Sequence, residues 1–400
     1  MAESTPPPQA PLRALLQSVA VAAILLVALE LGARLWTAAE PEGPAPTVSA
    51  PGAAMGQTLP GNPHLLWELA PGTWPVEGGT ARVNALGMRD GERGPRQRPR
   101  ALVVGDSSIF GFGVDQDELF TTLLEAELQA DVVNAGVPGW SSVQALNMLH
   151  LRGLSLDPDL LIVATLWSDN NFDAFVDEEV IAEVRTSGAL RSLLERSALF
   201  RAIDPLAARV TGRSSRTIAT IATEAPDAGR RRVPLQRYAE NLEAMARLMH
   251  ERGGGVAFVT LANRMDIQRR PGDPLVWQPY RDAMRLVAER WGAPLVVLPD
   301  VFPRQGGLSL LMDEIHPNPR GHAVMARALQ VALAEAGWPD QAPLRQEPPR
   351  DPLPQLDDPY EGQGVSLGLV EPDRGRGGHQ PPAPGARPLG APPPPGGRPR

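Results

Sequence analysis

The sequence contains no cysteine, which excludes disulfide bonds and zinc sites built from thiolates. The cellular compartment stays open on this count, because proteins without cysteine occur on both sides of a membrane. The net charge of −8, with no basic stripe and no aromatic-rich binding motif, argues against a nucleic-acid partner. The six histidines show no spacing typical of metal ligands, so we expect neither a metal nor another cofactor.

Apart from one hydrophobic run near the N-terminus, both ends of the chain are rich in proline and glycine and poor in periodic apolar residues. Length alone would predict two or three domains, but the 44 prolines and 39 glycines crowd the ends of the 400 residues, so we expect one domain at 79–340. Residues 1–11 are rich in proline and are expected to be disordered, and residues 37–78 have the composition of a linker. Residues 341–400 offer too little apolar surface to offset the ordering of the chain, which predicts a disordered tail.

One long hydrophobic run lies near the N-terminus. Residues 12–29 are almost entirely apolar, and with the segment that contains Glu30 and Arg34 they approach the length of a bilayer span. We therefore predict a single transmembrane anchor at 12–36, with the domain outside the cytoplasm, in the periplasm. The alternative is a signal peptide cleaved at 37–39 (Thr-Ala-Ala), although the charged turn before that site argues against cleavage.

Between these ends, strand and helix patterns alternate. Short apolar runs predict strands at 102–104, 132–134, 158–165, 253–261 and 294–298, and helical periodicity predicts helices at 118–128, 142–151, 235–249, 277–291 and 319–336. This rhythm predicts an α/β fold with a doubly wound parallel sheet of about five strands. Residues 172–233 are interpreted as an insertion that covers the mouth of the site as a lid or as a wall for the substrate. Its arginine triplet at 230–232 is expected to be a solvated loop or, alternatively, a contact for an anionic lipid or polymer.

Two motifs carry the chemistry. Residues 105–108 (Gly-Asp-Ser-Ser) follow the first strand and form a tight turn, which places a serine at the carboxyl end of a strand, where open α/β sheets hold their sites. A serine hydroxyl needs a histidine base that is oriented by a carboxylate. Asp313 and His316 lie together before the last helix and can supply both groups. We therefore expect Ser107, His316 and Asp313 to meet.

In these two motifs the chain resembles the SGNH (GDSL-type) hydrolases, whose first block is Gly-Asp-Ser and whose last block is Asp-x-x-His. The resemblance runs from about residue 84 to about residue 338 and is closest to membrane-tethered bacterial members. It implies the flavodoxin-like SGNH hydrolase fold. It also implies that Ser107 is the nucleophile, His316 the general base and Asp313 the residue that orients the base.

The resemblance also implies an oxyanion hole, and here the chain departs from the family. Backbone N–H groups of Ser107 and Gly136 match two of the expected donors. In the third block, residues 166–169 read Leu-Trp-Ser-Asp where the family usually has Gly-x-Asn-Asp, so Ser168 replaces the asparagine. Either the Ser168 hydroxyl or the Asn170 amide carries a hydrogen that could complete the hole.

These motifs favour a serine esterase or acylhydrolase that forms an acyl-enzyme on an ester substrate. The acyl group is expected to be short, for instance acetyl, and carried on a glycan or a lipid. Two alternatives stay open. Because of the altered third block, the chain could be a catalytically silent SGNH-like module that binds acylated glycans or a partner. It could also be an O-acetyltransferase, because water and a sugar hydroxyl attack the same acyl-enzyme.

Overall fold

A computed structural model describes the following residues of the chain: 10–39, 58–60, 62–76, 79–173, 175–182, 184–185, 197–199, 203, 230–268 and 275–362. The expected disorder of residues 1–9 and 363–400 and the first part of the expected linker lie outside these residues. Most of the expected insertion, including residues 204–229, also lies outside them.

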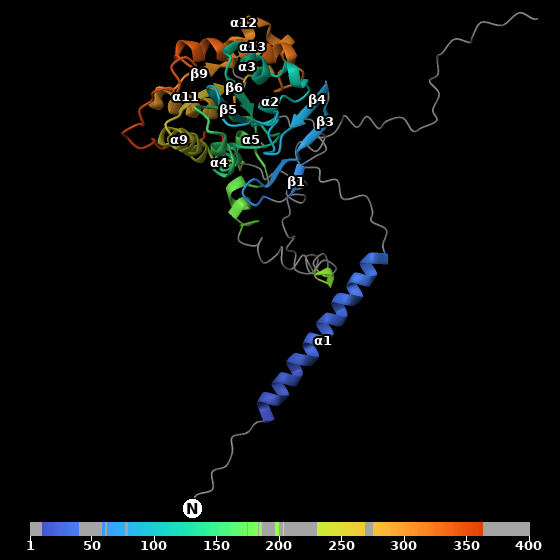
Figure 1. The fold of residues 1–400 in the computed structure, drawn as a ribbon. Coiled ribbons are helices and arrows are strands. Elements are labelled where there is room, and N and C mark those ends of the chain that lie inside the picture. Colours follow the sequence, from blue (N-terminus) through green and yellow to red (C-terminus); the bar gives the residue numbers. More distant parts are fainter. Residues whose placement is uncertain are drawn as a thin grey trace, which may run out of the picture.

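The domain is built on one parallel sheet of five strands (Figure 1). These are β5 (Arg100–Gly105), β6 (Asp131–Asn134), β7 (Leu160–Ala164), β8 (Gly255–Thr260) and β9 (Leu295–Val297), in the order β6-β5-β7-β8-β9. The strands from β5 to β8 are buried along their whole length, because helices cover both faces of the sheet. The expected doubly wound, flavodoxin-like fold is thereby confirmed.

Helices form the two outer layers. The longer ones are α3 (Phe120–Leu128), α4 (Ser142–Leu151), α9 (Leu235–Glu251), α11 (Gln278–Trp291), α12 (Leu298–Gln305) and α13 (Pro319–Glu335). The shorter ones are α2 (Ser107–Phe110), α5 (Trp167–Asn170) and α10 (Arg264–Gln268), with 3-10 turns η2 (Gln116–Glu118), η3 (Gly153–Leu156) and η4 (Gly307–Leu310). Helix α13 packs on α3 and α12 over one face, and α9 packs on α4 and α11 over the other (Figure 1). Helix α9 begins at the edge where the strands end, since the Tyr238 hydroxyl in its first turn donates to the Thr165 oxygen just after β7 at 2.7 Å.

Part of the expected linker belongs to the domain. Two antiparallel pairs form there, β1 (Thr58–Pro60) with β2 (Trp67–Leu69) and β3 (Gly72–Val76) with β4 (Gly79–Val83). The Trp67 ring is buried; its Nε1 donates to the Pro138 oxygen at 3.0 Å, and the Trp140 Nε1 donates to the Trp67 oxygen at 2.9 Å. The prediction of a linker at 37–78 is therefore wrong for residues 62–76. Their apolar residues show no local period because they pack against a distant loop.

The first part of the expected tail is also ordered on the domain. Leu344 is buried, and the Gln346 side chain accepts a hydrogen bond from the Val256 N–H at 2.8 Å and donates one to the Val256 oxygen at 2.7 Å. The prediction of disorder over 341–400 is therefore wrong for residues 341–362. Composition misled it, because a few specific contacts to the domain compensate for the low apolar content.

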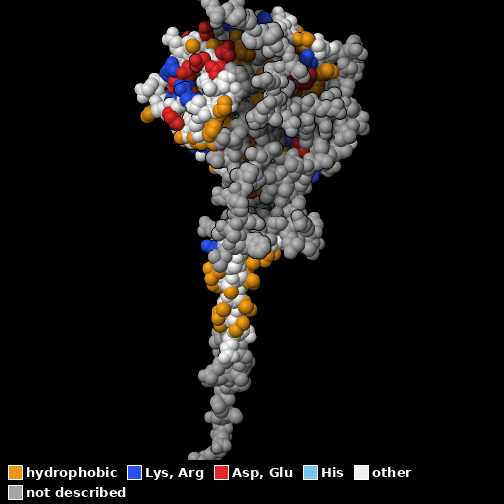
Figure 2. All heavy atoms as spheres, turned by 90° about the vertical axis from the view of Figure 1, so that its right-hand side faces the viewer, with side chains coloured by type: hydrophobic (Ala, Val, Ile, Leu, Met, Phe, Trp, Pro, Cys, Tyr) orange, Lys and Arg blue, Asp and Glu red, His pale blue; other side chains and the backbone are white. Residues whose placement is uncertain are grey.

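Helix α1 (Ala10–Ala39) lies N-terminal to the domain. Its Glu30 and Arg34, one helical turn apart, form an ion pair at 2.8 Å, and apolar side chains are exposed along the helix (Figure 2). Among the described residues, no helix meets the length and apolar character required to cross a membrane. The transmembrane anchor predicted at 12–36 is not confirmed, and cleavage at 37–39 stays a prediction.

Candidate active site

Three loops meet at the carboxyl edge of the sheet. Strand β5 leads into α2, which begins with Ser107; β6 leads into residues 135–140; and β7 leads into α5. Strand β5 lies between β6 and β7, where the order of the strands along the chain reverses. A crevice at such a switch point is the usual site for chemistry in an open α/β sheet.

The structure brings Ser107, His316 and Asp313 together at this edge. The distance from His316 Nε2 to Ser107 Oγ is 2.8 Å, and the distance from His316 Nδ1 to Asp313 Oδ2 is 2.6 Å. Ser107 is partly exposed. This is the arrangement in which a histidine can activate a serine hydroxyl while a carboxylate orients its ring.

Asp313 is held by its own turn. Its Oδ1 accepts hydrogen bonds from the backbone N–H groups of Ile315, at 2.9 Å, and His316, at 2.8 Å. Burial by itself would raise the pKa of Asp313, but the His316 ring and these two N–H groups outweigh it and lower the pKa below its ordinary value. The carboxylate is therefore ionised at neutral pH and leaves Oδ2 to His316.

Arg89 supports the turn that follows Ser107. Its buried guanidinium donates through Nη1 to the carbonyl oxygens of Phe110, at 2.8 Å, and Gly111, at 2.6 Å. Gly111 has a φ of +86°, a conformation that favours glycine. Phe112, in the same turn, lies with its ring 4.9 Å from the His316 ring. Arg89 thus positions a wall of the site rather than reacting.

Asp106 joins the serine turn to α5. It is buried and accepts hydrogen bonds from the N–H of Ser108, at 2.9 Å, and of Trp167, at 3.1 Å. Burial raises the pKa of Asp106, although these hydrogen bonds act in the opposite direction. No hydrogen bond from the Ser107 N–H to another described residue is found, so this group is free to serve as an oxyanion donor.

Gly136 does not present its N–H to the site. This N–H donates to Asn134 Oδ1 at 3.0 Å, and the same side chain donates through Nδ2 to the Ile109 oxygen at 2.8 Å. A Cβ at Gly136 would lie 2.5 Å from the Phe110 nitrogen, so glycine is needed for close packing of two backbone segments. The expected oxyanion role of Gly136 is corrected accordingly, because its N–H is already engaged.

Gly139, three residues further on, was missed by the sequence interpretation. It is partly exposed at φ +78°, and its carbonyl oxygen accepts from Arg232 Nη1 at 2.9 Å. Its N–H makes no hydrogen bond within the described part of the chain. The Pro138-Gly139 pair is a turn signal that could have indicated it. Gly139 therefore replaces Gly136 as the candidate donor from this loop.

The third block retains one candidate donor. The Asn170 amide donates to the Leu166 oxygen at 2.7 Å, within α5, so the expectation that it completes the hole is corrected. Ser168 is buried in the same short helix, and its hydroxyl is not bonded to any residue that the structure describes. Ser168 is therefore the side chain of this block whose donor is available.

Asp169 is a buried carboxyl group next to Ser168. Its Oδ1 accepts from the Ser142 N–H at 2.8 Å, while Oδ2 is buried and finds no partner among the described residues. Burial raises the pKa of Asp169 to about 7, and the negative charge of Asp177 adds to this effect. Around neutral pH the group is therefore present in both its protonated and its ionised form.

Replacing Asp169 with asparagine should change how stability depends on pH. The pKa of about 7 lies above the ordinary value of 3.8, so the folded state binds the proton more tightly than the unfolded state. The stability that this provides is complete below about pH 4 and is lost as the pH rises through about 7. Between pH 4 and pH 8 the free energy of unfolding of wild type, measured with urea, should fall by a few kcal/mol more than that of Asp169→Asn. If the unfolding free energies of wild type and Asp169→Asn changed with pH in parallel, Asp169 would not have a raised pKa. Asp357→Asn, at an exposed site, is the control and should follow wild type.

Two arginines of the 230–232 triplet are buried. Arg231 has an exposed fraction of 0% and Arg232 of 2%, so the prediction of a solvated loop is wrong for both. Arg232 donates through Nε and Nη2 to the two oxygens of buried Asp177, at 2.9 and 2.8 Å. Its remaining nitrogen holds the Gly139 carbonyl. Carboxylates from distant segments compensate for the charges of the two arginines, and the sequence around the triplet does not reveal these partners.

His322 is not a second base. It is buried on α13, and its Nδ1 accepts a hydrogen bond from the Phe120 N–H at 3.1 Å. Burial, together with the positive charge of Arg89, lowers the pKa of His322 to about 3. The ring is therefore neutral and serves packing.

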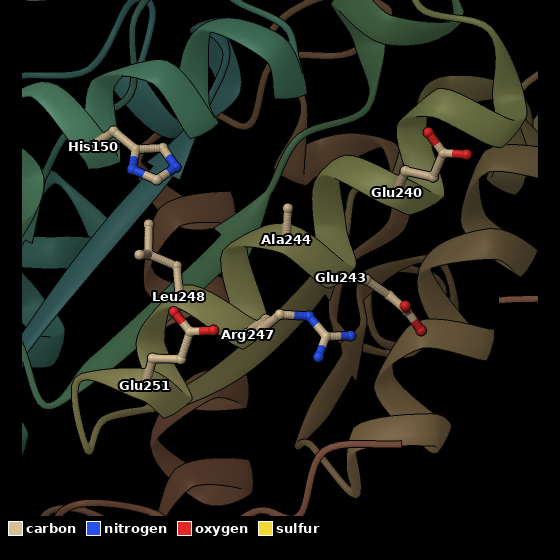
Figure 3. A pocket seen from close by; sticks show the side chains of 7 residues that line it. All are labelled: His150, Glu240, Glu243, Ala244, Arg247, Leu248 and Glu251. Carbon is tan, nitrogen blue, oxygen red and sulfur yellow. The ribbon is translucent and has the colours of Figure 1, made fainter. Parts of the chain in front are cut away.

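Two surface hollows lie away from the triad. One, of about 290 Å³, lies between His150 of α4 and side chains of α9, among them Glu243 (Figure 3). Glu243 is bound to Arg290 at 2.6 Å. The other, of about 610 Å³, lies between β9, α12 and α13. Neither is lined by Ser107 or His316, and the described residues hold no metal-binding cluster.

Comparison with known proteins points to one family. The model of the GDSL-like Lipase/Acylhydrolase family matches residues 103–324. Similar solved structures include LAE5, an alpha/beta hydrolase enzyme from the metagenome of Lake Arreo, Spain, at 19% identity, covering 60% of this chain and 97% of that one with a TM-score of 0.38. Another is the lipase/acylhydrolase from Enterococcus faecalis, at 14% identity, covering 62% and 100% with a TM-score of 0.38. A comparison with curated protein sequences finds no match.

Proposed function

The chain belongs to the GDSL-like lipase/acylhydrolase family and is a serine ester hydrolase, and from this premise we propose that it cleaves its ester through Ser107, His316 and Asp313. The observation that carries this proposal is the 2.8 Å contact between His316 Nε2 and Ser107 Oγ. The second contact, from His316 Nδ1 to Asp313, supports it because it directs the base toward the serine.

In the proposed reaction His316 Nε2 takes the hydroxyl proton while Ser107 Oγ attacks the ester carbonyl carbon. The tetrahedral intermediate collapses when His316 returns the proton to the departing alcohol, which leaves an acyl-enzyme on Ser107. Water then gives a proton to His316 and attacks the acyl carbonyl, and His316 returns this proton to Ser107 Oγ as the acid is released. Throughout, Asp313 stabilises the imidazolium and holds its ring in place.

Three groups can bind the oxyanion of this intermediate. The Ser107 and Gly139 N–H groups and the Ser168 hydroxyl come from the three loops that follow β5, β6 and β7, and none of them is engaged by another described residue. Such donors act on charge that develops in the transition state, and losing one costs on the order of 100- to 1000-fold in rate.

Ser168→Ala should lower kcat by on the order of 100-fold with little change in KM, because the hydroxyl acts chiefly on transition-state charge. The measurement is steady-state hydrolysis of a chromogenic ester. Ser155→Ala, at an exposed 3-10 turn, is the matched control and should be silent. Ser168→Asn should retain activity, because asparagine also donates. An unchanged kcat in Ser168→Ala would mean that the oxyanion hole is built from other groups.

We further propose that the acyl group is short and carried on a glycan or a lipid. A series of chromogenic esters from acetyl to octanoyl tests the chain length, and addition of an acceptor sugar tests for acyl transfer. Absence of turnover with every ester would favour the silent binding module instead. The location outside the cytoplasm, expected from residues 12–36, also stays a proposal, and fractionation of cells with an antibody to the domain tests it.

A further inference from the structure

Residues 341–361, here called the C-terminal strap, run along the domain toward the active-site edge. Near its start, Gln346 is bonded to Val256, at the beginning of β8 and therefore at the amino edge of the sheet. Further along, the Asp351 oxygen accepts from Arg290 near the end of α11, and the Leu356 N–H donates to Gln236 at the start of α9, each contact measuring 2.7 to 2.8 Å. Because α9 begins at the carboxyl edge of the sheet, the strap crosses the whole domain.

At the end of the strap, Asp358 binds the buried Arg231. The side chains of Asp358 and Arg231 have exposed fractions of 4% and 0%. Arg231 donates through Nε to Asp358 Oδ2 at 2.7 Å and through Nη2 to Asp358 Oδ1 at 3.3 Å. The Tyr360 N–H donates to the same Oδ1 at 3.0 Å, which fixes the carboxylate. In the described chain no other acidic side chain bonds to Arg231, so Asp358 compensates for its buried charge.

Arg231 in turn holds the end of α5, the short helix that contains Ser168. Its Nη1 donates to the Asn170 carbonyl oxygen at 2.6 Å, one of the carbonyls that the end of a helix leaves without a partner. The guanidinium also lies 3.9 Å from the centre of the Phe172 ring, just after the helix. The next residue continues the contact, because the Arg232 N–H donates to the Asn171 oxygen at 2.8 Å.

We propose that Asp358 is a positioning residue, which acts through Arg231 to hold α5 and so places Ser168 at the oxyanion side of the site. This inference rests on the proposed esterase function for its kinetic consequence, but the contact between the strap and α5 does not depend on it. Ordering of the strap and geometry of the site are therefore coupled, although 190 positions of sequence separate Ser168 from Asp358.

The test compares Asp358→Asn with Asp357→Asn in the full chain. Asp357 is the neighbouring carboxylate, it is exposed, and no bond from its side chain to the described residues is found, so its variant removes the same charge without touching Arg231. We expect Asp358→Asn to lower kcat by on the order of tenfold or more with KM within about twofold, since small misplacements of a reacting group are costly. Asp358→Glu, which retains the charge, should recover part of the loss.

Hydrogen–deuterium exchange gives a measure that does not need an ester. In Asp358→Asn, but not in Asp357→Asn, exchange in a peptide covering residues 166–173 should become at least about tenfold faster, because the end of α5 loses its support. If Asp358→Asn fails to fold, Arg231→Lys is tested instead. Lysine keeps the positive charge, but its single ammonium group cannot bind Asp358 and the Asn170 carbonyl oxygen at the same time as the planar guanidinium does.

The outcomes separate the two proposals. Unchanged exchange and unchanged kcat in Asp358→Asn, with wild type active, would overturn the strap proposal and leave the esterase function standing. A lower melting temperature alone, with kcat and exchange of residues 166–173 as in wild type, would also overturn it, since Asp358 would then serve only stability. If wild type cleaves no ester, the esterase proposal fails, and faster exchange in Asp358→Asn still supports the contact between the strap and α5.

Discussion

Ser107→Ala should reduce kcat for ester hydrolysis by on the order of 10⁴- to 10⁶-fold, because the variant can no longer form an acyl-enzyme. The residual rate would come from binding and from the oxyanion donors acting on water. KM should change little, since the Ser107 side chain makes no described contact apart from the one to His316. Hydrolysis of a chromogenic short-chain ester by purified wild type and variant measures the loss.

A second readout identifies the nucleophile directly. A phosphonate that labels activated serines should add one adduct to wild type, at Ser107, and none to Ser107→Ala. Ser155→Ala, whose hydroxyl lies on a remote 3-10 turn, should match wild type in both measurements. Activity of Ser107→Ala within tenfold of wild type would refute the proposed mechanism.

Asp313→Asn should lower kcat by on the order of 10⁴-fold while leaving the fold intact. The side-chain oxygen of the asparagine would keep the hydrogen bonds from the N–H groups of Ile315 and His316, so its NH₂ would face His316 Nδ1. An N–H at this position requires Nδ1 to accept, which puts the ring proton on Nε2. Nε2 would then be unable to take the Ser107 proton.

Measurement of kcat against pH tests this tautomer argument. Hydroxide can remove the serine proton without histidine, so activity of Asp313→Asn should rise with pH above neutrality, whereas wild type, which uses His316 as the base, should not depend on hydroxide in this way. Glu314→Gln, the exposed neighbour that pairs with Arg264, is the control and should follow wild type. A variant with the wild-type kcat and pH profile would show that Asp313 does not orient the base.

Local pattern was enough to predict the main architecture. The apolar runs at β5, β6, β7 and β8 are strands because both faces of each are buried, and this requires continuous rather than alternating apolar residues. Their alternation with helices determines a parallel sheet. The Ser107 turn and the Asp313-His316 pair could also be found in the sequence, because each is a short contiguous motif, and their catalytic roles are what the resemblance to the family implies.

The oxyanion donors could not be assigned from sequence. Gly136 and Gly139 lie in the same loop, and the choice between them depends on which N–H is already bonded, here that of Gly136 to Asn134. The prediction that the Asn170 amide completes the oxyanion hole was wrong for the same reason, since this amide already donates to the Leu166 oxygen. Availability of a donor is a property of all its neighbours in space, which the spacing of a motif does not contain.

The sequence by itself determined the five-stranded parallel sheet and the serine at a strand end, because local hydrophobic period and turn chemistry specify them. Only the tertiary structure decided that the chain from residue 62 to 76 and the strap belong to the domain. It also decided that Arg231 is buried. The physical reason is the same in each case: a guanidinium or a short apolar segment is stable in the interior only when a distant partner, here Asp358 or Trp140, is brought to it.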